Sequence, residues 1–165
     1  MEPKVADAGK ELRDALELPK VSQIGMVVLN LRKTVAYYED TLGIGPFVLS
    51  GRDFELKFEC IEYRGRTVDS EFLMAFAPLG GLELEFIQTW KGPTLYDEFL
   101  ERAGEGIHHV GFDVDDLDDR LARYRNLGID VLMEGRTKQG GFAYLDTERI
   151  GGMIFELVQR PAIRA

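Results

Sequence analysis

The chain has 165 residues, of which 45% are hydrophobic and 30% charged, with a formal net charge of −9, and is expected to be globular. The negative surplus repels phosphate backbones and anionic bilayers, so we expect neither nucleic acid nor a membrane as partner. The single cysteine excludes an internal disulfide, and no apolar run approaches the roughly 20 residues of a membrane span. Because the N-terminus lacks the apolar core of a signal peptide, we expect a cytoplasmic protein.

The first half of the chain predicts one strand, one helix and three further strands. Residues 1–20 are expected to form a polar lead-in, and the first strand begins at Val21. Apolar residues at steps of three and four predict a helix from about Leu31, stopped by Gly43. The three strands that follow are expected at about 53–63, 71–77 and 82–88.

The second half repeats this pattern after a connecting helix expected at 91–105. Gly25 falls on Gly111, Leu31 falls on Leu117, and "LGI" at 42–44 matches "LGI" at 127–129. The last three strands of this copy are expected at about 130–134, 142–146 and 153–159. The predicted fold class is α+β: two βαβββ modules, at 21–90 and 106–161, form one domain with a curled mixed sheet around a shared cleft.

Four polar residues occupy matched places on strands that face this cleft. Gln23 matches His109 on the first strands, and Glu85 matches Glu156 on the last strands. Both glutamates have apolar neighbours, and a buried carboxylate without a partner costs several kcal/mol. One divalent cation would offset that cost, and an amide oxygen, an imidazole and two carboxylates suit a six-coordinate metal with open positions. Alternatively, the four are polar groups that are solvated or hydrogen-bonded without any metal.

The two histidines of the chain are adjacent, in the stretch "EGIHHVGFDV". Neighbouring residues on a regular strand point to opposite faces, so at most one of them is expected in the cleft. His109 is the expected ligand because it matches Gln23 in the repeat. His108 is expected to face the other way, as a packed or hydrogen-bonded side chain.

The sequence resembles the vicinal oxygen chelate superfamily, which includes glyoxalase I, extradiol dioxygenases and bleomycin-resistance proteins. The stretches "QIGMVVLNLRKTVAYYEDTLGIGPF", "GEGIHHVGFDVDDLDD" and "IFELVQRP" are most similar to the methylmalonyl-CoA epimerase and glyoxalase-like branch. The resemblance implies a homodimer with one divalent ion (Zn, Co, Ni, Mn or Mg) held by Gln23, Glu85, His109 and Glu156. Epimerases usually carry histidine at the first of these places, whereas Gln23 is similar to the zinc form of glyoxalase I. Extradiol dioxygenases need two histidines and one carboxylate around iron, which this set does not provide.

The resemblance also implies chemistry through a metal-stabilised enolate. We expect an isomerase or epimerase acting next to a thioester or ketone carbonyl, on a small-molecule substrate such as an acyl thioester. Glu156 is the expected base, and "VDSEFLMAFAP" resembles the epimerase strand that carries a second glutamate, which would be Glu71. The alternative for Glu71 is a solvated strand start. Two other functions stay open: a glyoxalase I-like lyase acting on a thiol adduct, and a non-catalytic small-molecule binding or resistance protein.

Overall fold

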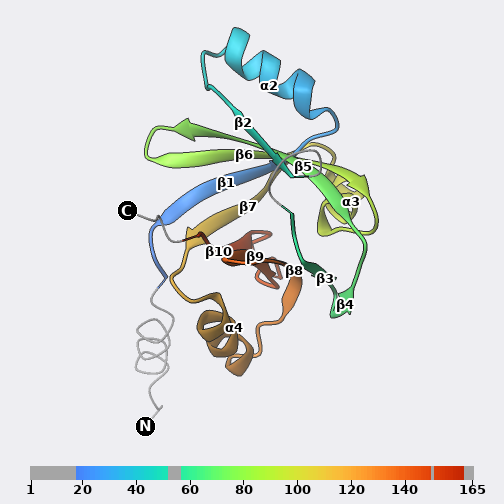
Figure 1. The fold of residues 1–165 in the computed structure, drawn as a ribbon, viewed down its shortest axis with the longest axis vertical. Coiled ribbons are helices and arrows are strands. Elements are labelled where there is room, and N and C mark those ends of the chain that lie inside the picture. The colour runs from blue at the N-terminus through green and yellow to red at the C-terminus, as the bar shows by residue number, and fades with distance from the viewer. Residues whose placement is uncertain (1–17, 52–56, 150, 162–165) are drawn as a thin grey trace.

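The computed structural model describes residues 18–51, 57–149 and 151–161, so nearly all of the expected lead-in at 1–20 lies outside the described residues. The described residues form one ten-stranded mixed sheet in the order β2-β5-β6-β1-β7-β10-β9-β8-β3-β4. Figure 1 shows this sheet curling around an interior, with the helices packed along it. The predicted fold class is confirmed. Each helix in the described part of the chain is too short or too polar to cross a lipid bilayer.

Each half of the sheet has the same order of strands, seen from the middle outward. The first half consists of β1 (Val21–Val27), α2 (Leu31–Asp40), β2 (Val48–Gly51), β5 (Glu71–Leu79) and β6 (Leu82–Lys91). After the connecting helix α3 (Leu95–Ala103), the second half consists of β7 (Gly106–Asp113), α4 (Leu117–Asn126), β8 (Val131–Thr137), β9 (Gly140–Leu145) and β10 (Ile154–Gln159). In each half the first strand runs parallel to the last, β1 beside β6 and β7 beside β10. The halves join through the antiparallel pair β1 and β7, which places β6, β1, β7 and β10 at the centre of the sheet.

One predicted strand differs in its extent, and its pairing was not predicted. Within the strand expected at about 53–63, the structure shows only β3 (Cys60–Tyr63) among the described residues; β2 ends before it at Gly51, and 52–56 lie outside the described residues. β3 and its hairpin partner β4 (Arg66–Thr67) do not pair with their own half but extend the second half through β8. This pairing covers an edge of β8 that would otherwise be open, and it packs Ile61 against the interior of the second half.

Helices α2 and α4 cover the outer face of the two halves. Leu31 of α2 packs with Leu84 and Phe86, and Leu117 of α4 packs with Leu157. The start of each helix is tied to the last strand of its own half: Gln88 Oε1 accepts from Leu31 N at 2.7 Å, and Gln159 Oε1 accepts from Leu117 N at 3.0 Å. These two glutamines match in the sequence repeat, and the structure gives them the same role.

The inner face holds the main core and leaves polar residues at the middle of the sheet. Its apolar cluster gathers side chains from both halves and from α3, including Val27, Phe72, Tyr96, Phe142 and Tyr144. Because side chains alternate along a strand, the residues that share this inner face include Gln23 and Gly25 on β1 and Glu85 on β6.

Candidate metal centre

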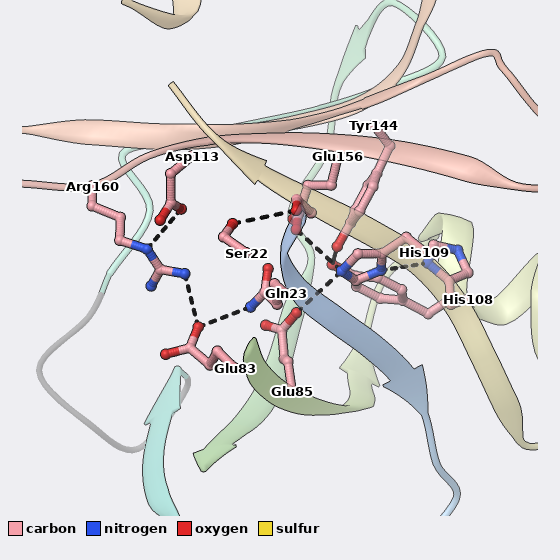
Figure 2. Close-up of polar contacts among 12 residues, drawn as sticks. Ser22, Gln23, Glu83, Glu85, His108, His109, Asp113, Tyr144, Glu156 and Arg160 are labelled. Atoms are coloured by element: carbon pink, nitrogen blue, oxygen red, sulfur yellow. Dashed lines mark hydrogen bonds and ion pairs between the residues drawn. The ribbon is translucent and has the colours of Figure 1, made fainter. Parts of the chain in front are cut away.

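The four matched polar residues come together on the inner face, one from each of the four central strands. Gln23 lies on β1, Glu85 on β6, His109 on β7 and Glu156 on β10, and all four are at most 4% exposed. Figure 2 shows their side chains converging from these neighbouring strands. The repeat therefore delivers two side chains from each half to one place.

The distances define a compact group. His109 Nε2 lies 3.1 Å from Glu156 Oε2 and 3.4 Å from Glu85 Oε2. One ligand atom from each of these three residues lies within 4.8 Å of the others, a spacing at which one cation can touch all three. Gln23 Oε1 and Glu156 Oε2 both approach the same point beside Gly111, where an added Cβ atom would lie 2.8 and 3.2 Å from them. The amide oxygen thus belongs to the same group.

Two glycines make room for the group, and they too match in the repeat. Gly25 is paired with His109 across β1 and β7, and Gly111 is paired with Gln23. A Cβ atom on Gly25 would lie 1.8 Å from Cε1 of His109, well inside any real contact. Each half therefore supplies a ligand and, two residues later, the gap into which the ligand of the other half fits.

Charge and burial make the group a site for a positive charge. Burial raises the pKa of Glu85 to about 7. Burial would lower the pKa of His109, but Glu156 and Glu85 outweigh burial and raise that pKa to about 9. Without a cation these two carboxyl groups therefore favour the protonated form of the imidazole. A divalent ion would take the place of that proton between the same atoms.

Hydrogen bonds to residues outside the cluster fix the orientation of the Gln23 amide. Gln23 Nε2 donates to Glu83 Oε1 at 3.2 Å, and Arg160 Nη2 donates to the same oxygen at 2.8 Å. Arg160 Nε in turn donates to Asp113 Oδ1 at 2.9 Å, and Figure 2 shows this chain of contacts running away from the cluster. Because the carboxylate of Glu83 requires a donor, the Nε2 group faces Glu83 and Oε1 faces inward.

The expectation that His108 faces the other way is wrong. Gly25 of β1 pairs with His109 of β7, but the next residue, Met26, pairs with Ile107. His108 therefore has no partner on β1 and is the extra residue of a β-bulge. The bulge breaks the alternation of side chains, and both histidines are buried, with their Nδ1 atoms 3.0 Å apart. Sequence periodicity cannot reveal a bulge, although two adjacent histidines inside a strand were the available signal.

The structure does not bring Glu71 to this group. Glu71 is the first residue of β5, five residues before Phe76, which is the residue paired with Glu85. At about 3.3 Å per residue, Glu71 is roughly 16 Å along the strand from the level of the cluster. Its proposed role as a second base stays a prediction that this placement does not favour.

The side-chain atoms of the four residues are suitable ligands for a divalent cation. Gln23 Oε1, Glu85 Oε2, His109 Nε2 and Glu156 Oε2 are all buried, and none of them has a hydrogen-bond partner outside this group among the described residues. Buried polar atoms that lack such partners are rare in proteins, and here four of them lie at one place. One imidazole nitrogen and three oxygens suit zinc, nickel, cobalt, manganese or magnesium better than a soft metal.

Comparison with known proteins agrees with the fold. The model of the Glyoxalase/Bleomycin resistance protein/Dioxygenase superfamily matches residues 22–144, well over half of the chain. The uncharacterized protein YqjC of Bacillus subtilis strain 168 is 23% identical over 144 residues, which is 85% of this chain and 91% of that protein.

Two solved structures with the same fold are methylmalonyl-CoA epimerases. The Mycobacterium tuberculosis protein is 21% identical, with a TM-score of 0.61 over 88% of this chain and 89% of its own. A variant of the Streptomyces coelicolor protein in complex with 2-nitronate-propionyl-CoA is 24% identical, with a TM-score of 0.60 over 90% of this chain and 99% of its own. At these identities the likeness shows a shared fold.

Proposed function

Because the chain belongs to the Glyoxalase/Bleomycin resistance protein/Dioxygenase superfamily, we propose that it is a metal-dependent isomerase or epimerase that moves a proton next to a thioester or ketone carbonyl. The observation that carries the proposal is the convergence in a buried place of four polar atoms, two from each half, with no hydrogen-bond partner outside the group among the described residues. Burying these polar atoms inside an apolar core costs free energy. The same atoms are useful as a set of ligands for a metal ion.

Gln23, Glu85, His109 and Glu156 would hold the ion. The ion would supply a positive charge that polarises the carbonyl oxygen of the substrate, which is worth several kcal/mol in the transition state. Glu156 would swing from its place as a ligand to act as the base that removes the proton from the neighbouring carbon, and proton transfer by a positioned side chain contributes about 10²–10⁴ in rate. Both the epimerase reaction and the lyase reaction would pass through an enolate of the substrate.

An epimerase must also return a proton to the opposite face of the enolate. Glu85 and Glu156 come from β6 and β10, on opposite sides of the β1 and β7 pair, so they flank the imidazole from both halves. Without a cation, burial raises the pKa of Glu85 to about 7, and a bound cation would oppose that rise. Glu85 is therefore a better partner for Glu156 than Glu71.

The substrate class proposed is an acyl thioester. Support comes from the two epimerase structures of the same fold, one of them with an acyl-CoA analogue. An open groove of about 1110 Å³ is lined in part by Ser22, Phe76, Glu83 and Arg160, and none of the four cluster residues is in its lining. It offers space for a small molecule, and its link to the cluster is Glu83, which accepts a hydrogen bond from Gln23. The homodimer expected from the family stays a prediction.

A glyoxalase I-like lyase is the second candidate, and two observations favour it. The first ligand place holds Gln23 rather than histidine, and Glu71 is remote from the cluster. Such a lyase would use the same two glutamates on a thiol adduct, so the reactions differ in substrate rather than in site.

The test begins with the metal. Purified protein is analysed for bound metal and titrated with Zn²⁺, Co²⁺, Ni²⁺, Mn²⁺ and Mg²⁺ after treatment with EDTA. The metal-loaded protein is then incubated in D₂O with methylmalonyl-CoA and, separately, with a thiol adduct of a ketoaldehyde. Deuterium entering the carbon beside the thioester supports the epimerase, and turnover of the adduct alone supports the lyase. Failure to bind any of these ions would overturn both and favour the non-catalytic binding protein.

A further inference from the structure

The rings of the adjacent histidines His108 and His109 contact each other in the interior, and only His109 is a proposed metal ligand. The β-bulge turns His108 into the interior, where it is 4% exposed. Its ring is enclosed by the rings of Tyr96, Phe99 and Tyr144, with centroids 5.2–5.4 Å away. Its Nε2 has no hydrogen-bond partner among the described residues, so the polar contact of the ring is Nδ1, 3.0 Å from Nδ1 of His109.

Two ring nitrogens at this distance can share one proton but cannot each carry one. Nε2 of His109 faces Glu85 and Glu156, so a divalent ion bound there by a neutral imidazole leaves the ring proton of His109 on Nδ1. The shared proton therefore lies on Nδ1 of His109, and Nδ1 of His108 accepts it. This arrangement requires a neutral His108 whose own proton is on Nε2.

We propose that His108 is a positioning residue that fixes the ring of His109 and its tautomer, leaving Nε2 of His109 available to a divalent ion. The inference rests on the proposed metal site. A metal-ligating histidine almost always donates its other ring nitrogen to a partner, and the loss of that partner typically costs 10–100-fold in metal affinity. In this chain the partner is the neighbouring histidine, brought into reach by the bulge.

The matched variants His108→Asn and His108→Leu separate this role from packing. The two residues are close in size, but only asparagine offers an oxygen acceptor near the place of Nδ1. In the aromatic enclosure leucine should give the more stable metal-free protein, because it buries no unpaired amide. Zn²⁺ affinity, measured by chelator competition, should follow the opposite order, with His108→Leu about 10–100-fold weaker than wild type and His108→Asn in between. Phe99→Leu alters the same enclosure and should lower stability while leaving Zn²⁺ affinity unchanged.

A second readout needs no metal. The chain has two histidines, so ¹⁵N-histidine labelling gives four ring signals. In EDTA we expect a scalar coupling between the two Nδ1 atoms across the hydrogen bond. No coupling, or equal Zn²⁺ affinity of the asparagine and leucine variants, would overturn the role of His108. If the wild-type protein bound no divalent ion, the proposed function would fail as well, and the coupling would still report whether the hydrogen bond exists.

Discussion

Substituting Gly25 by alanine tests the geometry of the cluster with a single methyl group. The added Cβ would lie 1.8 Å from Cε1, 2.2 Å from Nε2 and 2.5 Å from Nδ1 of His109, whereas ordinary van der Waals contact begins at 3.4 Å. The imidazole or the backbone of β1 must therefore move, by about 1.6 Å if the ring alone retreats. The tolerance of a metal–ligand distance is about 0.2 Å, so the ring would leave its place as a ligand.

Two effects should follow from Gly25→Ala. Zn²⁺ affinity, measured by chelator competition, should fall by at least about 100-fold, which is the upper end of what the loss of a supporting group costs. The free energy of unfolding without metal should fall by about 1–3 kcal/mol, the usual cost of overpacking a core, because His109 is buried against Tyr144 and His108.

Gly81→Ala is the matched control for this experiment. Its added Cβ would have no atom within 4 Å, so affinity and stability should both stay at the wild-type level. Gly111→Ala should lower Zn²⁺ affinity and stability by amounts between those of Gly81→Ala and Gly25→Ala. Its added Cβ would lie 2.8 Å from Gln23 Oε1 and 3.2 Å from Glu156 Oε2. Wild-type Zn²⁺ affinity in Gly25→Ala would refute the placement of His109 as a ligand.

Three other outcomes test the cluster. Glu156→Gln should abolish turnover, by about 10²–10⁴-fold or more, while circular dichroism stays unchanged, and an active variant would remove Glu156 as the base. In EDTA the free energy of unfolding, from urea titrations, should decrease as pH rises from 6.5 to about 9: the raised pKa of His109 stabilises the fold below 6.5, and this contribution is lost as the ring deprotonates. A rise in stability over this range would contradict that assignment. Glu83→Gln should lower Zn²⁺ affinity by about tenfold, because nothing then forces Oε1 of Gln23 inward, whereas Asp113→Asn, which leaves the bond from Gln23 to Glu83 in place, should not.

The sequence by itself determined the features that depend on repetition and alternation. Matched glycines and apolar residues predicted the two copies, and the period of two along a strand assigned Gln23, Glu85, His109 and Glu156 to one face. That assignment holds in the structure because β1, β6, β7 and β10 are neighbours and their shared inner face follows from local geometry. Gly25 and Gly111 were visible as a match, but their purpose was not.

Only the tertiary structure decided the features that depend on how strands pair. The bulge at His108 arises from the register between β1 and β7, and it turns a residue inward against the simple period. The crossing of β3 to β8 and the distance of Glu71 from the cluster depend on contacts between segments far apart in the chain. The same is true of the hydrogen bond from Gln23 to Glu83. Local sequence patterns fix which way a regular strand presents its side chains, whereas register, bulges and long-range partners are set by the free energy of the whole packed sheet.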